Sequence, residues 1–287
     1  RSTLFPYTTL FRSTNLEFKF IGTMNVYEFG TENRRKLLFF QGSCTCWRDY
    51  MPSIELLAQQ FHVIVPAFEG HDPVEKTDFI SVEKTVSDTA DYFSEHGHTS
   101  LYAVYGLSMG GGMALRLLAE QRIPVEKVII DGGITPYELP QWITRLILLR
   151  DYLMIRFIRS GMRIFKFFFD PKRWTVGSSD VEADYKAMFG FFKGLSRKTI
   201  WHVFDSANNY NVPLPLPELS TEIRYWYGSL ERKARKSDIR WMLKHVAGVQ
   251  IREIPDMEHG ELVLVHPQRF YETVIEFLNH NKNHSSV

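Results

Sequence analysis

The sequence predicts an α/β fold: a mostly parallel central sheet with helices on both faces, and a helical cap inserted between two of its strands. Three observations predict it. Short apolar runs alternate with amphipathic segments of helical length along most of the 287 residues. Several of these runs are apolar at consecutive positions, as in strands buried on both faces of a parallel sheet. The alternation stops between about residues 135 and 217, where only helical patterns occur.

The first half of the chain contains five strand-like runs, with helical segments between the later ones. Residues 16–21 and 25–29 form a hairpin, or the second run alone is native and forms a single strand. The helical segments are residues 47–60 and residues 81–96, and Gly97 ends the second of them. The remaining runs that we predict as strands are residues 37–40, 61–66 and 101–105.

The second half begins with a helix and a strand, and the alternation resumes after the helical block. The helix spans residues 113–120, and the strand at residues 127–130 is followed by Asp131. The block contains helical patterns at 139–169 (interrupted at Ser160 and Gly161), 180–192 and 196–208, and a proline-rich connector at 211–217 follows it. Strands at 223–227 and 249–254 then alternate with helices at 233–246 and 267–279.

These patterns divide the chain into a core, residues 14–134 and 218–280, and a cap, residues 135–217. We expect a flexible tail at residues 281–287. Residues 1–13 resemble the translation of a common sequencing adapter, so we expect an artefact without structural or targeting information. The sequence contains neither a convincing signal peptide nor an apolar run of membrane-spanning length, so we expect a cytoplasmic protein.

The composition excludes several classes of function. Hydrophobic residues make up 44% and charged residues 23% of the chain, which is typical of a globular protein with a large core. The net charge of +1 disfavours a nucleic-acid-binding role. The two cysteines, Cys44 and Cys46, are too close for an easy disulfide, and no paired metal-ligand spacing occurs. We therefore expect neither a metal nor another cofactor.

Gly106, Ser108 and Gly110 form a Gly-x-Ser-x-Gly motif between an apolar run and a helical pattern. This is the context of a nucleophile elbow, in which a sharp turn exposes a serine hydroxyl at the end of a strand and the positive end of a helix. Glycines are needed beside a serine in such a strained turn. Without this context the motif would describe only a glycine-rich turn. With it, Ser108 is the predicted nucleophile.

Glu231 and His259 follow two later predicted strands, so they should meet Ser108 at the carboxyl edge of the sheet, where ligands bind in α/β folds. The three residues occur in the chain order nucleophile, acid, base. A serine hydroxyl becomes nucleophilic when an imidazole takes its proton, and a carboxylate fixes the tautomer of that imidazole. Glu231 also begins a charged run that would suit a solvated face, so Asp131, one strand past the elbow, is the alternative acid.

Other side chains of catalytic type receive lesser roles. Asp205 and Asp238 are weaker candidates for the acid. The cysteines lack an elbow and are predicted to pack near the loop after residue 40 rather than to act as nucleophiles. The side chains that we predict to be structural are Asp256, His71, His266, Cys44 and Cys46.

Taken together, the motifs resemble those of the α/β-hydrolase superfamily, in its form with a cap domain. The resemblance covers about residues 24–278 and is weakest in the cap. A segment at residues 25–30 is similar to the start of bacterial hydrolases of unknown substrate, so the resemblance implies a reaction type but no substrate. It rests on the elbow, on Gly42 with Trp47, on Phe68-Glu69-Gly70-His71, on Gly228-Ser229-Leu230-Glu231, and on His259 followed by His266-Pro267.

The resemblance implies an oxyanion hole made by two backbone N–H groups, those of Ser43 and Met109, each worth roughly 3–4 kcal/mol in comparable sites. The sequence departs from the usual pattern of the family twice. Gln41 precedes Gly42 where His-Gly is usual, a change that need not remove the Ser43 N–H group. Glu231 stands where aspartate is more common, and its longer side chain would require a shifted backbone.

The first helical segment of the cap carries both apolar and basic residues. Residues 137–175 contain eight Lys or Arg against three Asp or Glu, a net charge of +5. We favour a lid whose apolar face covers the active site and whose basic stripe faces solvent. The alternative is a lid that lies on an anionic lipid surface. On a continuous helix, five basic side chains would fall within about 80° of one another: Arg145, Arg156, Arg159, Arg163 and Lys166.

We therefore expect a serine hydrolase that cleaves a carboxylic ester with a hydrophobic acyl or aryl group through an acyl-enzyme intermediate. Thioesterase, acyltransferase, peptidase and C–C bond hydrolase activities use the same triad and are the alternatives among enzymes. A non-catalytic binding protein on the same fold is the alternative from another class. The expected partner is a small-molecule substrate, and the sequence leaves the oligomeric state open.

Overall fold

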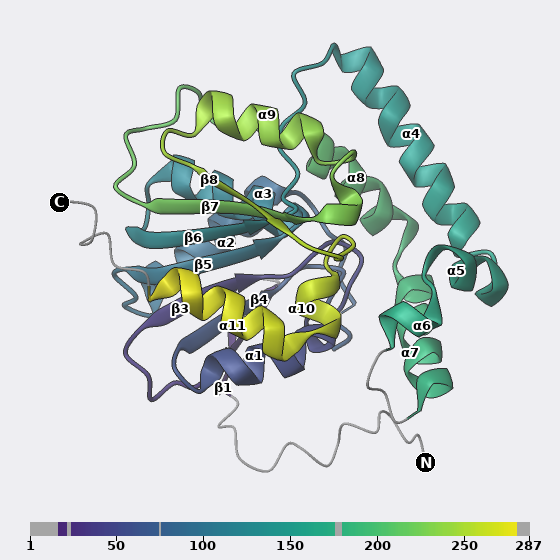
Figure 1. The fold of residues 1–287 in the computed structure, drawn as a ribbon, viewed down its shortest axis with the longest axis horizontal. Helices are drawn as coiled ribbons and strands as arrows, with labels where there is room; N and C mark the ends of the chain where they lie inside the picture. Colours follow the sequence, from purple (N-terminus) through teal and green to yellow (C-terminus); the bar gives the residue numbers. More distant parts are fainter. Residues whose placement is uncertain (1–16, 22–23, 75, 176–179, 280–287) are drawn as a thin grey trace.

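The computed structural model describes residues 17–21, 24–74, 76–175 and 180–279. Within these ranges eight strands form one sheet, and helices flank it (Figure 1). The strand order is β1-β2-β4-β3-β5-β6-β7-β8. The artefact predicted at residues 1–13 and the tail predicted at 281–287 lie outside the described residues. The strands are β1 (Glu17–Ile21), β2 (Met24–Phe29), β3 (Lys36–Phe40), β4 (His62–Ala67), β5 (Leu101–Leu107), β6 (Val125–Asp131), β7 (Glu222–Gly228) and β8 (Gln250–Ile254).

The sheet is antiparallel at one edge and parallel over the rest. β2 pairs with β1 and with β4 in antiparallel registers, and every further pair of neighbours is parallel. The first two strands form the hairpin that was one of the two predicted arrangements, with Ile21 opposite Met24. The mostly parallel sheet confirms the predicted fold class.

Helices cover both faces of the sheet. One face carries α2 (Val82–Glu95), α3 (Met109–Glu120) and α9 (Lys236–His245), and the other carries α1 (Met51–Ala58), α10 (Glu261–Val265) and α11 (Pro267–Leu278). The cause is the alternation of side chains along each strand. In β5, Val104 belongs to the apolar cluster that includes α2 and α3, whereas Tyr105 belongs to the cluster that includes α1 and α11. Apolar residues at consecutive positions therefore require cover on both sides.

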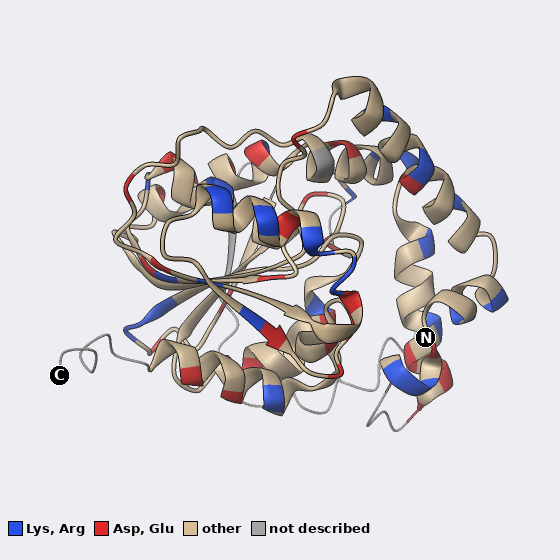
Figure 2. Cartoon of the chain, turned by 45° about the horizontal axis from the view of Figure 1, so that its top comes forward, with Lys and Arg blue, Asp and Glu red and all other residues tan. Residues whose placement is uncertain are grey.

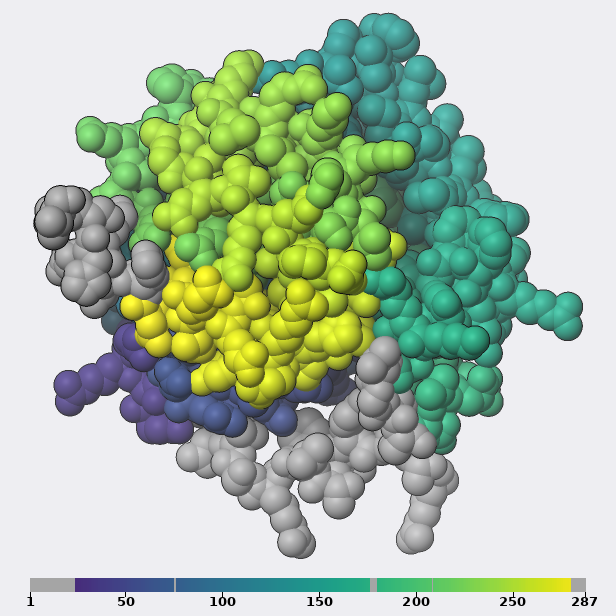
Figure 3. Space-filling model, viewed as in Figure 1, coloured from purple at the N-terminus to yellow at the C-terminus, as the bar shows by residue number. Residues whose placement is uncertain are grey.

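A group of helices separates β6 from β7 in the sequence, although these strands are neighbours in the sheet. We call it the helical insert; it consists of α4 (Gln141–Ile158), α5 (Met162–Phe168), α6 (Pro171–Trp174), α7 (Val181–Gly194) and α8 (Arg197–Asn209). Its apolar side chains form a cluster of their own that includes Ile155, Phe165 and Tyr185. The insert lies beyond the ends toward which the parallel strands point (Figure 1), and its teal atoms occupy one side of the molecule in Figure 3.

The first predicted helix of the cap is interrupted at Ser160 and Gly161, between α4 and α5, as the sequence indicates. The interruption changes the predicted basic stripe, because that stripe assumes a continuous helix. Arg159 turns toward the end of α7, where its guanidinium donates hydrogen bonds to the carbonyl oxygens of Lys193 and Leu195. It is therefore a cap for the neighbouring helix and not part of a solvated stripe.

The predicted apolar face of α4 is buried only in part. Leu148 and Ile155 are buried, whereas Leu146 and Phe157 are exposed. The prediction that the apolar face of this helix covers the active site is therefore wrong for these large side chains. Among the described residues, no helix is long and apolar enough to cross a membrane.

Candidate active site

Ser108 occupies the sharp turn between β5 and α3. Its backbone has φ 55° and ψ −116°, a conformation that costs on the order of 1–3 kcal/mol for a residue with a side chain. Its N–H donates to the Asp131 carbonyl at 2.8 Å, and its carbonyl accepts from the Ile134 N–H at 3.2 Å. The hydroxyl of Tyr210, just after α8, donates in turn to the Ile134 carbonyl at 2.7 Å. The turn is thus held by the end of β6 and, through one more hydrogen bond, by the end of the insert.

The glycines of the motif are required by the close packing of this turn. A Cβ atom at Gly106 would lie 2.2 Å from the Gly110 carbonyl oxygen, and one at Gly110 would lie 2.4 Å from the Gln41 carbonyl oxygen. Both contacts are to backbone atoms, which cannot move aside as a flexible side chain could. The second contact also places the end of β3 against the first turn of α3. The loop that follows β3 therefore borders the Ser108 turn.

Glu231 and His259 lie side by side although they follow different strands. Glu231 ends the short 3₁₀ turn η3 (Ser229–Glu231) after β7, and His259 lies in the loop between β8 and α10. The Nδ1 atom of His259 is 2.7 Å from Glu231 Oε2, and Glu231 Oε1 accepts a hydrogen bond from the Gly228 N–H at 3.1 Å. Because an ionised carboxylate only accepts hydrogen bonds, Nδ1 carries a proton in this pair, and in the neutral form of the ring the lone pair is on Nε2.

The surroundings of Glu231 keep its carboxyl ionised. The side chain is only 6% exposed, and burial by itself raises the pKa of Glu231. The hydrogen bond and the charge of His259 outweigh this effect, together with Arg235, whose Nε lies 3.3 Å from Glu231 Oε2. The pKa of Glu231 therefore falls below its ordinary value, and the group is charged near neutral pH.

Arg235 is a member of the site that the sequence did not single out. Its largely buried guanidinium lies 3.4 Å from Asp238 (Nη1 to Oδ2) and donates a hydrogen bond to the Gly132 carbonyl at 2.9 Å. It therefore ties the Glu231 turn to the loop after β6. The available signal was its position four residues after Glu231. The predicted helix at 233–246 obscured that signal, because residues 232–235 form a turn and α9 begins only after it.

Asp131, the alternative acid, ends β6 and is buried away from water. Its Oδ2 accepts a hydrogen bond from the Tyr105 hydroxyl at 2.7 Å. Burial raises the pKa of Asp131 to about 7; the Tyr105 hydrogen bond opposes this rise, and the charge of Glu231 adds to it. The structure thus pairs the imidazole of His259 with Glu231, and it pairs Asp131 with a tyrosine.

The raised pKa of Asp131 predicts a pH-dependent cost to stability. Between its ordinary value of 3.8 and about 7, the folded state binds a proton that the unfolded chain releases, so stability falls as pH rises through this window. Asp131→Asn does not titrate, so its free energy of unfolding relative to the wild type should rise between about pH 4 and pH 7, by about 4 kcal/mol. Urea unfolding at several pH values measures the difference. Glu126→Gln, an exposed position on the same strand, is the control; a pH-independent offset for Asp131→Asn would contradict the prediction.

Gly132 brings the imidazole close to the Ser108 turn. It has φ 52°, and a Cβ atom there would lie 2.8 Å from His259 Nδ1 and 3.0 Å from Glu231 Oε1. The His259 ring therefore packs against Gly132. The residue before Gly132 is Asp131, and its carbonyl accepts the hydrogen bond from the Ser108 N–H. Among the described residues, Ser108 and His259 are connected by this shared neighbour and not by a direct hydrogen bond.

The loop after β3 contains the predicted oxyanion-hole donor. The Tyr50 hydroxyl accepts a hydrogen bond from the Gly42 N–H at 3.0 Å, and Gln41 Nε2 donates to the carbonyl four residues later at 3.1 Å. Gln41, in the place of the usual histidine, thus stabilises the loop through a hydrogen bond from its side chain to the backbone of the same loop. Ser43 is the next residue of this loop, and Met109, the second predicted donor, is the first residue of α3.

The weaker acid candidates make contacts of other kinds. Asp238 accepts hydrogen bonds from the N–H and the hydroxyl of Thr135, at 2.8 and 2.9 Å, and so holds the loop after β6. Asp205 forms an ion pair with Arg145 inside the insert, at 2.7 Å. Asp256 adopts φ 58° in the turn after β8. These contacts of Asp238 and Asp205 are with Thr135 and Arg145, and not with His259.

The two histidines predicted to be structural lie apart from the Glu231–His259 pair. His71 is fully buried, and its Nδ1 contacts the Glu69 carbonyl at 3.0 Å. Burial lowers the pKa of the His71 imidazole to about 4, so this ring is neutral near pH 7. His266 Nε2 lies 3.5 Å from a carboxylate oxygen of Glu261.

Apolar side chains join the insert to the core near the loop after β3. Cys44, which follows Ser43, packs against a core cluster and against the cluster of the insert, and so does Phe204 of α8. Phe191 of α7 connects the insert to the second core cluster. Burial raises the pKa of the Cys44 thiol to about 12 and that of Cys46 to about the same value, so neither is a thiolate near neutral pH.

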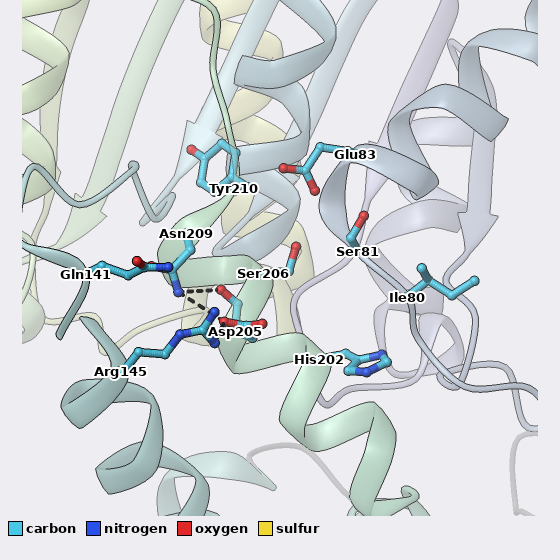
Figure 4. Close-up of a pocket in the computed structure, with 10 residues that line it drawn as sticks. All are labelled: Ile80, Ser81, Glu83, Gln141, Arg145, His202, Asp205, Ser206, Asn209 and Tyr210. Carbon is cyan, nitrogen blue, oxygen red and sulfur yellow. Dashed lines mark hydrogen bonds and ion pairs between the residues drawn. The ribbon is translucent and has the colours of Figure 1, made fainter. Parts of the chain in front are cut away.

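A cavity of about 430 Å³ lies between α8, α4 and the start of α2 (Figure 4). Ser108, Glu231 and His259 do not line it, and several of its polar groups already have partners inside the protein. Ser206 Oγ, for example, accepts a hydrogen bond from the Val82 N–H at 2.7 Å. We therefore place the candidate site at the sheet edge and not in this cavity. The cavity is lined by Ile80, Ser81, Glu83, Gln141, Arg145, His202, Asp205, Ser206, Asn209 and Tyr210.

Several solved structures share this fold. An alpha/beta hydrolase family protein from Desulfitobacterium hafniense is 18% identical, with a TM-score of 0.69 over 88% of this chain and 100% of its own. A carboxylesterase from Nitrososphaera gargenis is 15% identical (TM-score 0.68; 91% and 97%), and an enol-lactonase from Burkholderia xenovorans LB400 is 16% identical (TM-score 0.67; 92% and 100%). At these identities the likeness shows the fold alone.

The sequence itself gives the family. No curated protein matches it. The model of a family described as the alpha/beta hydrolase family matches residues 37–273, which is more than half of the chain and includes the Ser108 turn, Glu231 and His259. The chain belongs to the alpha/beta hydrolase family.

Proposed function

We propose that this protein is a serine hydrolase that cleaves a carboxylic ester by way of an acyl-enzyme. The observation that carries the proposal is the Glu231–His259 pair, with Nδ1 and Oε2 2.7 Å apart, held against the loop that fixes the Ser108 turn. A buried, ionised carboxylate orients the imidazole and stabilises its charged form, which is the function of the acid in such a triad. The positive-φ turn at Ser108 supplies the strained elbow of the nucleophile.

In the proposed mechanism, His259 Nε2 takes the proton of the Ser108 hydroxyl as Oγ attacks the ester carbonyl. The N–H groups of Ser43 and Met109 stabilise the negative oxygen of the tetrahedral intermediate. The intermediate collapses, the C–O bond to the alcohol breaks, and His259 returns the proton to the leaving oxygen. Water, deprotonated by the same Nε2, then attacks the acyl-enzyme. The bond between the carbonyl carbon and Ser108 Oγ breaks, Oγ takes the proton back from His259, and the carboxylic acid leaves. Glu231 stays ionised throughout and balances the imidazolium.

An apolar acyl or aryl group in the substrate is favoured by the junction between insert and core. Cys44, which follows Ser43 in the sequence, packs there, and Phe204 and Phe191 connect the insert to the two core clusters. Apolar walls with a few convergent polar groups are typical of small-molecule sites. The carboxylesterase and the enol-lactonase of the same fold are named for cleaving an ester and a cyclic ester, which agrees with this substrate class.

A fluorophosphonate probe with peptide mapping tests the proposal. Such a probe reacts with an activated serine, so we expect one adduct on Ser108 and none on Ser206, which lines the cavity. Native protein that gives no adduct at Ser108 would support the non-catalytic alternative. A panel of p-nitrophenyl esters and matched thioesters of increasing acyl length tests the bond type. Faster turnover of the thioesters would overturn the ester assignment while leaving the nucleophile in place.

A further inference from the structure

Helix α4 carries apolar side chains on two opposite faces. One face packs into the molecule, in part against α8, through residues that are buried: Thr144, Leu148, Ile155 and Ile158. The other face points to solvent. We call its apolar residues the solvent stripe: Trp142, Leu146, Leu149, Leu153 and Phe157.

The solvent stripe runs along the whole of α4. At 100° per residue its members fall within about 80° of one another, and the centre of this arc lies opposite the buried face. The exposed fractions are high, at 66% for Trp142, 59% for Leu146 and 57% for Phe157. Single exposed apolar residues are ordinary on a protein surface, but a contiguous row marks a surface that binds an apolar partner.

Arginines border the solvent stripe on both sides. Arg145 and Arg156 lie on one side of it and Arg150 on the other, and all three are exposed. Asp151, the only acidic residue of α4, lies toward the buried side and pairs with Arg150 at 2.7 Å. Basic residues also recur along the neighbouring helices of the insert (Figure 2). With eight Lys or Arg against three Asp or Glu, residues 137–175 carry a net charge of +5.

An apolar row between cations favours one partner over the others. A second copy of the chain, with its stripe against this one, would bring the arginines of both copies together, and like charges at an interface are costly. A bilayer surface with acidic lipids offers an apolar layer for the row and negative charge for the arginines. Trp142, at the start of the helix, has an amphipathic ring of the kind found at headgroup level.

We propose that the solvent stripe docks on the surface of an anionic lipid bilayer, with α4 lying in the plane of the interface. The helix binds from one side and does not span the bilayer, because its opposite face is packed against the protein. Docking involves α4, whereas the proposed chemistry involves Ser108, Glu231 and His259 on other elements. Binding to vesicles needs no substrate, so the failure of either proposal is distinguishable from the failure of the other.

The test is co-sedimentation of the full chain with lipid vesicles. Vesicles of phosphatidylcholine with phosphatidylserine are compared with vesicles of phosphatidylcholine alone, at low and high salt. We expect binding to the acidic vesicles at low salt, and binding at least about tenfold weaker to the neutral vesicles. High salt should weaken binding to the acidic vesicles, because it screens the arginines.

Two matched pairs of variants locate the docking surface. Leu146→Ser/Phe157→Ser should lower partitioning onto acidic vesicles about tenfold or more, whereas Leu243→Ser, an exposed leucine on α9, should bind as the wild type does. Arg156→Glu should lower partitioning by about tenfold, whereas Arg240→Glu makes the same charge change on α9 and should have little effect. Circular dichroism and thermal unfolding establish that each variant is folded.

Three results would overturn the proposal. The first is a wild-type chain that fails to sediment with acidic vesicles at low salt. The second is equal loss of binding in the α4 variants and in their α9 controls. The third is a dimer in solution that Leu146→Ser/Phe157→Ser converts to a monomer without lipid, because a second copy would then be the natural occupant of the stripe.

Discussion

Replacing Ser108 by alanine is expected to lower kcat for a short p-nitrophenyl ester by about 10⁴-fold or more. The reason is that the proposed acyl-enzyme forms on the Oγ atom of Ser108. Among the described residues, no other hydroxyl lies in a positive-φ turn that borders both the loop after β3 and the contact between Gly132 and His259. Stability should change little, because alanine meets the same backbone conformation and keeps the hydrogen bonds of the Ser108 N–H and carbonyl groups. Steady-state hydrolysis and thermal unfolding measure the two effects.

The control for this prediction is Ser206→Ala. Ser206 lies in the cavity of Figure 4 and accepts a backbone hydrogen bond from the start of α2, so its loss should affect stability modestly and turnover little. If Ser206→Ala abolishes hydrolysis and Ser108→Ala keeps wild-type turnover, the active site is the cavity and the elbow is only a structural turn.

The second large effect is expected from Glu231→Gln, which should lower kcat by about 10³–10⁴-fold. Glutamine keeps the length of the side chain but removes the negative charge that balances the imidazolium of His259. Its amide can also donate a hydrogen bond, which would favour the tautomer with the proton on Nε2, and that tautomer cannot accept the serine proton. Measuring kcat and kcat/KM of the variant and the wild type over a range of pH shows whether the loss of activity is present at every pH.

Asp131→Asn is the matched comparison for Glu231→Gln. Asparagine can still accept the hydrogen bond from Tyr105. The carboxylate that His259 contacts is Glu231 and not Asp131. We therefore expect the activity of Asp131→Asn to stay within about tenfold of the wild type. If Asp131→Asn loses activity and Glu231→Gln keeps it, then Asp131 is the acid and the Glu231–His259 pair is structural.

The strands and the position of the turn were predictable because their signals are local. Consecutive apolar residues at 101–105 require cover on both faces, and the glycines at 106 and 110 are required by contacts within a few residues and with the neighbouring strand. Because parallel strands end at one edge, the sequence could place Glu231 and His259 near each other. The structure sets their side chains 2.7 Å apart.

Both acids are buried, and they differ in the side chain that each one contacts, which the sequence does not contain. Asp131 reaches the end of β6 on the face where Tyr105 lies, so its carboxyl is enclosed by the core. Glu231 sits at the end of a 3₁₀ turn that directs its longer side chain to His259, with Arg235 behind it. The backbone shift predicted for a glutamate at this position stays a prediction. The turn was hidden in the sequence by a run of charges that also suits a helix.

Other elements could not be predicted because they are short or depend on packing. The helices α6 and α10, of four and five residues, are too short to show a periodicity, and the apolar residues of α10 would fit a strand equally well. In α4 the pattern has apolar residues nearly all round, so the sequence alone does not decide which face packs. Contact with α8 decides it, and leaves Leu146 and Phe157 in solvent.

The hydroxyl of Tyr210 limits how far the protein can be trimmed. The ring of Tyr210 also packs against Gly112 in the first turn of α3. A Cβ atom added at Gly112 would lie 3.1 Å from the end of the Tyr210 side chain. Excision of the whole region from residue 135 to residue 217 would leave the Ile134 carbonyl without its donor and open a gap beside that turn. A miniature version of this fold must therefore retain the last turn of α8 with Tyr210, and its splice point belongs upstream of them.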